Sequence, residues 1–228
     1  MQQQKINTII FDLDGTLVNS IDDLTDNVNR VLGAEGYPKR SLEEVKSFVG
    51  NGIPILMERS LPQGTPQEEV LRCLKIFTVY YLHNMHNKTQ PYEGIVPVLE
   101  ELKKRNIKTG VVSNKLDEAT KKMCSHYFPH LIDAAIGDTE HRKKKPCADN
   151  VLEAMDILQA KRETTLYVGD TKVDVETARN SGLPILGASW GYRGRKKLEK
   201  AGPDFIIDTP FEILTWLDGK IASNTKVD

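Results

Sequence analysis

The sequence predicts an α/β fold, a doubly wound parallel sheet of the Rossmann-like kind with an inserted helical cap domain. From Gly94 onward, short apolar segments alternate with helical patterns, which is typical of a parallel sheet covered by helices. One more apolar, β-branched strand is expected near the start of the chain, just before Asp12. No strand pattern interrupts residues 20–84 between them. We therefore expect a core domain of residues 1–16 and 87–228 and a cap domain of residues 17–86.

The alternating part of the chain predicts the elements of the core in order. After the first strand, further strands are expected at residues 107–113, 132–136, 165–169 and 184–188, with 205–207 as an added edge strand. The helices between them are expected at residues 95–105, 117–128 and 147–160, in a segment ending at Gly182, and at residues 211–218.

Helix-start signals divide the cap into four helices. Ser20 is expected to cap the first helix together with Asp23 at its third position, a variant of the capping box. A second helix is expected to start near Ser41 and a third near Gly52. The segment Thr65–Glu68 offers a cap residue, a proline at the first helical position and a glutamate at the third, so it predicts the fourth.

Two carboxylates follow the first strand at alternate positions, Asp12 and Asp14, and Gly15 comes next. An extended backbone points both side chains to the same side, and the carboxyl end of a strand is where ligands bind in open α/β sheets. Two such charges repel by about 4 kcal/mol at about 4 Å and an effective dielectric of about 20, so a cation between them is favoured. Taken alone, the segment is equally compatible with a surface turn.

Three further strand ends carry matching polar residues. Ser113 and Asn114 end one strand, Lys145 precedes a proline and a helical pattern, and Asp170 ends another strand with Asp174 four residues later. Carboxylates, a hydroxyl, a lysine and carboxylates again form a set suited to phosphoryl transfer with its metal ligands. Each has a structural alternative: the Ser-Asn pair as a helix cap, and Asp174 as a first-turn acid favoured by the helix dipole.

The order and strand-end placement of these motifs resemble the haloacid dehalogenase (HAD) superfamily of phosphatases, from Lys5 to about Ala188. The resemblance implies that Asp12 is the nucleophile and forms an aspartyl-phosphate, while Asp14 acts as acid and then as base. It implies Mg²⁺ held by Asp12, Asp170 and the backbone carbonyl of Asp14.

The resemblance also gives roles to the remaining motif residues. Ser113 and Lys145 neutralise the phosphoryl oxygens, and Asp174 orients the lysine or a metal-bound water. Ala148 stands where the family commonly has a second proline, and the run Lys143–Lys145 leaves Lys144 as the alternative motif lysine. The helical insertion is expected to be a mobile cap that closes over the site.

The cap segment 49–61, the Ser113–Lys115 stretch and the loop 190–193 look like the corresponding segments of phosphoglycolate phosphatases. This favours 2-phosphoglycolate as substrate, with Ser113, Asn114, Gly52 and Arg59 contacting it. Gly52 allows close backbone approach, and Arg59 offers a guanidinium to a carboxylate unless it forms a surface salt bridge. The alternatives are an inorganic pyrophosphatase, a β-phosphoglucomutase-like enzyme and a non-enzymatic regulatory binding protein on the same fold.

Composition excludes several other classes of function. The 228 residues carry 31 Lys and Arg against 32 Asp and Glu, a net charge of −1, which predicts no nucleic-acid partner. The absence of long apolar runs predicts no membrane segment or signal peptide. Three scattered cysteines, Cys73, Cys124 and Cys147, predict free thiols in a reducing cytoplasm. We expect a cytoplasmic monomer or homodimer whose partner is a small phosphate substrate.

Overall fold

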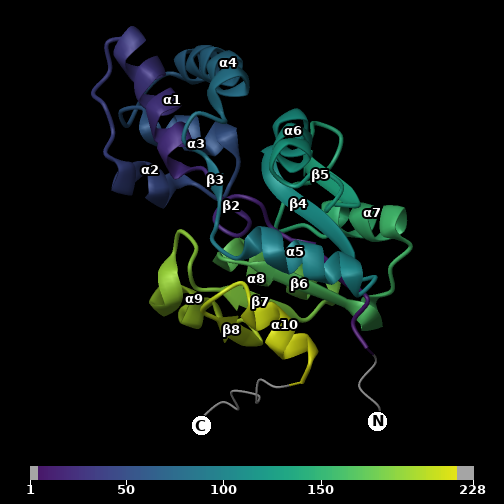
Figure 1. The fold of residues 1–228 in the computed structure, drawn as a ribbon. Coiled ribbons are helices and arrows are strands. Elements are labelled where there is room, and N and C mark those ends of the chain that lie inside the picture. The colour runs from purple at the N-terminus through teal and green to yellow at the C-terminus, as the bar shows by residue number, and fades with distance from the viewer. Residues whose placement is uncertain (1–4, 220–228) are drawn as a thin grey trace.

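The computed structural model describes residues 5–219, and its core is a parallel sheet with the strand order β5-β4-β1-β6-β7-β8 (Figure 1). The strands are β1 (Thr8–Phe11), β4 (Lys108–Leu116), β5 (Ala134–Asp138), β6 (Thr165–Gly169), β7 (Ile185–Ala188) and β8 (Phe205–Ile207). The chain runs from β1 outward to β5 and then returns to β6 on the other side of β1. The strand order therefore reverses beside β1, and the carboxyl ends of β4, β1 and β6 border the crevice where such sheets bind ligands.

Helices cover both faces of this sheet, and the residues of β1 alternate between them. Ile9 and Phe11 pack into the core formed with α5 (Ile95–Lys104), α6 (Asp117–Tyr127) and α10 (Glu212–Leu217). Ile10 belongs to the opposite core, formed with α7 (Asp149–Leu158), α8 (Lys172–Ser181) and α9 (Gly194–Ala201). A short 3₁₀ helix, Arg162–Thr164, precedes β6. The predicted doubly wound fold is confirmed.

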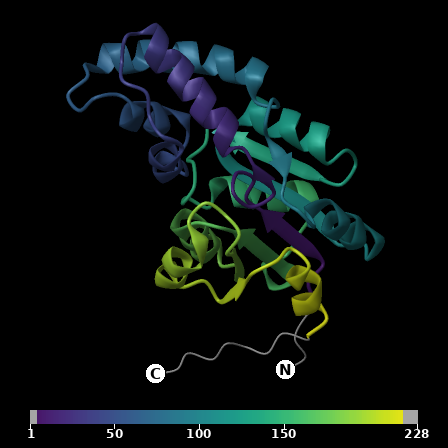
Figure 2. The same ribbon diagram turned by 60° about the vertical axis from the view of Figure 1, so that its left-hand side comes forward.

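Four of the five helices between β1 and β4 pack on one another and lie together at one end of the core (Figures 1 and 2). They are α1 (Ile21–Ala34), α2 (Leu42–Phe48), α3 (Ile53–Ser60) and α4 (Gln67–Asn84). The chain enters and leaves this cap through two short antiparallel strands, β2 (Val18–Asn19) and β3 (Gln90–Pro91), which the sequence pattern did not predict. The pairing holds the two connections between cap and core side by side.

The capping box predicted at the start of α1 is wrong, although the helix begins where expected. Ser20 is the cap residue but makes no capping bond, because its hydroxyl donates to Asp14 Oδ1 at 2.5 Å. Asp23 instead accepts the backbone N–H groups of Lys88 and Thr89 and the Thr89 hydroxyl at 2.7–3.0 Å. Ser20 therefore ties the entry of the cap to the core, and Asp23 ties α1 to the returning connection, instead of capping their own helix.

Of the other two helix starts with capping residues, one forms its cap and the other does not. The second cap helix starts at Ser41, as predicted, and Ser41 and Glu44 form a complete capping box there that was not predicted. At α4 the predicted cap is wrong, since Thr65 donates to the carbonyl of Pro62 and Pro66 occupies the cap position without a side-chain bond. The helix α9 lies in a segment for which no helix was predicted.

Two expectations from composition are also addressed. Cys73, Cys124 and Cys147 are all free thiols. Among residues 5–219, no helix combines the length and the apolar character needed to cross a membrane.

Candidate active site

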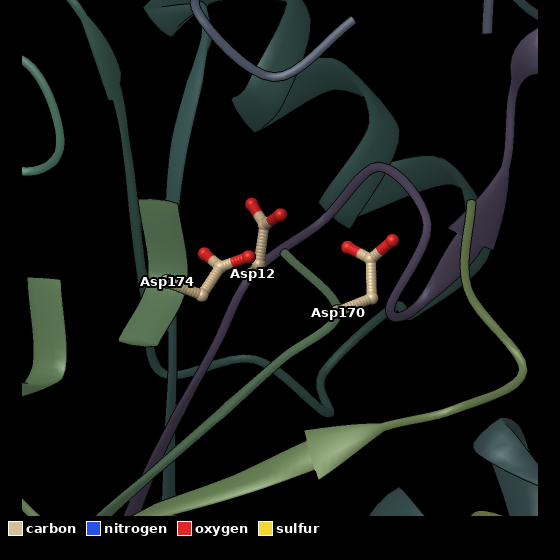
Figure 3. Close-up of side chains that lie close together, drawn as sticks. All are labelled: Asp12, Asp170 and Asp174. Carbon is tan, nitrogen blue, oxygen red and sulfur yellow. The ribbon is translucent and has the colours of Figure 1, made fainter. Parts of the chain in front are cut away.

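The carboxyl ends of β1 and β6 bring three aspartates together (Figure 3). Asp12 follows β1, Asp170 follows β6, and Asp174 lies in the first turn of α8. One oxygen of each carboxylate lies within 4.8 Å of the others, and all three residues are buried. The structure thus assembles Asp12, Asp170 and Asp174 from distant parts of the chain, as the strand-end pattern predicts.

Lys145 is the cation of this cluster, and Lys144 is not. The Lys145 ammonium lies 2.8 Å from Asp12 Oδ1, 2.8 Å from Asp174 Oδ1 and 3.2 Å from the Tyr167 hydroxyl. The Lys144 side chain is 40% exposed and lies 3.8 Å from Asp138. The geometry therefore assigns the motif lysine to Lys145.

The cluster carries more negative than positive charge. Burial, followed by the charge of Asp174, raises the pKa of Asp12 to about 7. Burial and the same neighbour raise the pKa of Asp170 well above its ordinary value. Burial alone would lower the pKa of Lys145, yet the charges of Asp12 and Asp174 raise it well above the usual range. Three carboxylates around one ammonium form a set of oxygen ligands that fits a divalent cation.

Asp174 is occupied on both of its oxygens. Oδ1 accepts from Lys145 and Tyr167, while Oδ2 accepts the backbone N–H and the hydroxyl of Thr171 in a capping box. Its helix-start role and its site role are therefore both present. A metal ion would be held by Asp12 and Asp170, whose remaining oxygens are less engaged.

Glycines provide the space that Asp170 needs. A Cβ on Gly191 would lie 2.2 Å from the Asp170 Cβ, and one on Gly15 would lie 2.6 Å from Oδ2. Gly15 also has a φ of 90°, which side-chain-bearing residues rarely adopt. The backbone N–H of Tyr192 then donates to Asp170 Oδ2 at 2.7 Å. Any larger residue at either glycine would displace a carboxylate of the site.

Asp14 lies apart from the carboxylate cluster. Both of its oxygens are 2.9 Å from Lys115 Nζ, and Oδ1 accepts the Ser20 hydroxyl. Tyr192 extends this network, with its hydroxyl 2.9 Å from Ser20 Oγ. Sequence reasoning named none of Lys115, Ser20 and Tyr192 as an active-site residue: it expected Ser20 to cap a helix, and it noted Lys115 and Tyr192 only as parts of longer similar segments. The available signal for Lys115 was its position directly after the polar pair that ends β4.

An irregularity in β4 turns three successive side chains toward one pocket. The pairing with β5 shifts register between Val112 and Leu116, and bulges of this kind re-aim side chains next to active sites. Ser113, Asn114 and Lys115 consequently all line the pocket. None of them caps α6, whose cap position is Leu116.

Asn114 joins three parts of the site. Its side-chain amide donates to the carbonyls of Gly50 at 3.0 Å and Lys145 at 3.1 Å, and its oxygen accepts the Lys145 N–H at 2.8 Å. Asn114 therefore positions the motif lysine and links it to the cap. This contact set differs from the expected role in substrate binding, although Asn114 does line the pocket.

The cap contributes mostly apolar side chains and glycines to the pocket. Gly52 lies so close to the core that an added Cβ would be 3.2 Å from the Asn114 carbonyl oxygen. The structure does not bring Arg59 to this pocket: its side chain is exposed, 3.4 Å from the carbonyl of Phe48. The expectation that Arg59 contacts substrate is not supported, because α3 points that residue away from the wall it provides. The cap residues in the wall are Leu24, Val49, Gly50, Gly52, Ile53 and Leu56.

Arg193 fastens the cap in this position. Its guanidinium donates to the backbone carbonyls of Lys46 at 2.6 Å and Val49, at the end of α2. Because Arg193 follows Tyr192 directly, one core loop contacts Asp170, Ser20 and the cap.

The chain belongs to the haloacid dehalogenase-like hydrolase family, whose model matches residues 9–188. This confirms the resemblance inferred from the four motifs. A phosphoglycolate phosphatase from Aquifex aeolicus is 34% identical over 95% of this chain and 99% of its own length. The pyrophosphatase PpaX from Bacillus mycoides is 29% identical over 92% of this chain and 96% of its own.

A solved structure from Lactobacillus delbrueckii subsp. bulgaricus, provisionally named a phosphoglycolate phosphatase, is similar in fold and sequence. It superposes with a TM-score of 0.88 at 29% identity, covering 94% of this chain and 99% of that one. The similarity in fold thus extends over nearly the full length of both chains.

Proposed function

We propose that this hydrolase is a magnesium-dependent phosphatase that acts on a small anionic phosphomonoester, most favourably 2-phosphoglycolate, through an aspartyl-phosphate. The observation that carries the proposal is the separation of the two aspartates of the first motif. Asp12 lies against Lys145 at 2.8 Å, whereas Asp14 is held by Lys115 and Ser20 on the other side. Two carboxylates in different environments suit a nucleophile and an acid-base group.

The proposed reaction has two steps. A carboxylate oxygen of Asp12 attacks phosphorus, the bond from phosphorus to the ester oxygen breaks, and Asp14 protonates that oxygen. Asp14 then takes a proton from a water that attacks the phosphorus of the aspartyl-phosphate, which returns Asp12 and releases phosphate. Lys145 and Ser113 stabilise the charge on the phosphoryl oxygens.

The proposed cofactor is Mg²⁺, held by Asp12, Asp170 and the backbone carbonyl of Asp14. When bound, it supplies positive charge that neutralises the phosphate and the carboxylates around it. Asp174 positions Lys145 within this arrangement, through the 2.8 Å bond between them.

The substrate assignment rests on the relatives and on the contacts between the cap and the core beside the site. The Aquifex aeolicus relative, which aligns over nearly all of this chain, is a phosphoglycolate phosphatase. Asn114 and Arg193 hold the cap against the core beside the pocket, and a site between two such parts suits a small molecule. The PpaX relative favours inorganic pyrophosphate as the second candidate, with the same chemistry at Asp12.

The test is a comparison of kcat/KM for 2-phosphoglycolate, pyrophosphate and a neutral sugar phosphate in Mg²⁺. The proposal expects 2-phosphoglycolate to be the best of the three. A tenfold advantage for the neutral sugar phosphate, about 1.4 kcal/mol of transition-state preference, would overturn the anionic substrate class. An advantage for pyrophosphate would replace the substrate and keep the reaction.

A further inference from the structure

The pocket contains two cationic side chains, and one of them, Lys145, is already assigned to the reacting phosphoryl group. Among the described residues that line it, the cations are Lys115 and Lys145. The three N–H donors of Lys145 are matched by Asp12, Asp174 and Tyr167. The cap residues that line the pocket include no lysine or arginine. A substrate with a second negative group therefore has Lys115 as its available cationic partner.

Lys115 is unusual because lysine side chains are rarely buried, and this one is only 2% exposed. Its ammonium bonds both oxygens of Asp14 and lies 4.8 Å from the centre of the Tyr81 ring. An ammonium has three N–H donors, and these contacts use at most two of them in hydrogen bonds. A buried ammonium with a remaining donor binds an anion more strongly than an exposed one, since water screens it less.

The position of Lys115 beside Asp14 relates it to one part of the substrate. Asp14 is proposed to protonate the ester oxygen, so that oxygen must lie next to Asp14. In 2-phosphoglycolate the carboxylate is attached to the carbon that carries the ester oxygen, and in pyrophosphate the second phosphorus carries it directly. A donor 2.9 Å from Asp14 is therefore within reach of a negative group adjacent to the leaving oxygen.

We propose that Lys115 determines specificity by binding the negative group next to the leaving oxygen. This inference rests on the proposed function and identifies the residue that binds the substrate's second negative group. The anion shares the ammonium with Asp14, which keeps its bond to Ser20 at 2.5 Å. A phosphomonoester without a second negative group provides no partner for the ammonium and gains nothing from it.

The test compares 2-phosphoglycolate with ethyl phosphate, an ester with the same number of carbons that has no charged group besides its phosphate. We measure the ratio of the two kcat/KM values in the wild type, Lys115→Met, Lys115→Gln and Arg59→Met. The Gln variant removes the charge but retains an N–H donor toward Asp14. The Arg59 variant removes an exposed cation from outside the pocket, so it is the matched control.

The ratio is expected to fall at least tenfold in both Lys115 variants and to stay unchanged in Arg59→Met. Equal losses on the two substrates would overturn the inference, because Lys115 would then only position Asp14. So would a fall in the ratio for Arg59→Met that matches the Lys115 variants. If either Lys115 variant fails to fold by circular dichroism, the other gives the result.

A second readout does not depend on turnover or on the folding of those variants. Isothermal titration of 2-phosphoglycolate and ethyl phosphate into Asp12→Asn, with and without Lys115→Arg, measures binding alone. Tighter binding of 2-phosphoglycolate that survives the charge-conserving change supports the inference, and equal binding of both ligands to Asp12→Asn contradicts it. A wild type that hydrolyses neither compound would refute the proposed function instead.

Discussion

Replacing Lys145 by methionine removes the ammonium that the structure places between two buried carboxylates. Lys145 Nζ bonds Asp12 and Asp174 at 2.8 Å each, with its side chain 2% exposed. Removing one partner of a buried ion pair costs about 3–5 kcal/mol, because it leaves an uncompensated charge. We therefore expect a loss of this size in the free energy of unfolding at pH 8 in chelator.

Activity should fall as well, by an independent mechanism. A positioned donor to charge that develops in the transition state contributes about 10²–10³ in kcat, and Lys145 is also proposed to neutralise the phosphoryl group. The expected loss with 2-phosphoglycolate is therefore at least two orders of magnitude. Urea unfolding and phosphate release measure the two effects.

Lys144→Met is the matched control. Its ion pair with Asp138 spans 3.8 Å and the side chain is 40% exposed, and exposed pairs contribute about 0–1 kcal/mol. We expect near-wild-type stability and activity. Equal effects at the two lysines would refute the assignment of the motif to Lys145, and a greater effect at Lys144 would reverse it.

Three further outcomes follow from the same contacts. Arg193→Met loses the bonds to Lys46 and Val49, so the cap should open more readily and the radius of gyration from small-angle scattering should increase. An unchanged scattering profile would show that Arg193 does not hold the cap in place. The raised pKa of Asp12 means that the folded protein holds a proton between pH 3.8 and about 7 that the unfolded chain releases, so stability in chelator falls as pH rises through that window. Mg²⁺ competes with this proton, so adding Mg²⁺ should raise Tm more at pH 8 than at pH 5.5. The opposite order would contradict the proposed metal site at Asp12. Tyr81→Phe removes a buried hydroxyl that has no hydrogen-bond partner among the described residues, so it should be neutral or stabilising by about 1–3 kcal/mol in thermal unfolding, and a marked loss would reveal a missing partner.

The strand-end residues could be predicted because their chemistry depends on local order. A buried strand followed by a carboxylate places that carboxylate at the carboxyl edge, whatever the rest of the chain does. Asp12 and Asp170 were found in this way. Lys145 was found because it precedes a proline and a helical pattern, and the choice between Lys144 and Lys145 needed the bonds to Asp12 and Asp174. The position of β6 also matched the predicted range, because five buried residues between turn signals leave little freedom.

The errors arose where a side chain has a partner far away in sequence. Ser20 has every local property of a helix cap, yet its hydroxyl forms hydrogen bonds with Asp14 and Tyr192 instead of capping the helix. Lys115 is ordinary in sequence and becomes a buried cation only because β4 changes register beside it. Arg59 has suitable chemistry, but the orientation of α3 decides its exposure. The spacing of residues along a helix does not determine how the whole helix is oriented against the core.

The central claim is that Asp12 is the nucleophile of a phosphatase that acts on a small anionic ester. The most direct measurement is phosphate release from 2-phosphoglycolate in Mg²⁺ by the wild type and by Asp12→Asn, with the fold of each verified by circular dichroism. The account predicts turnover by the wild type, its loss on chelation, and a decrease of several orders of magnitude in a folded Asp12→Asn. Substantial turnover by that variant would contradict the covalent mechanism.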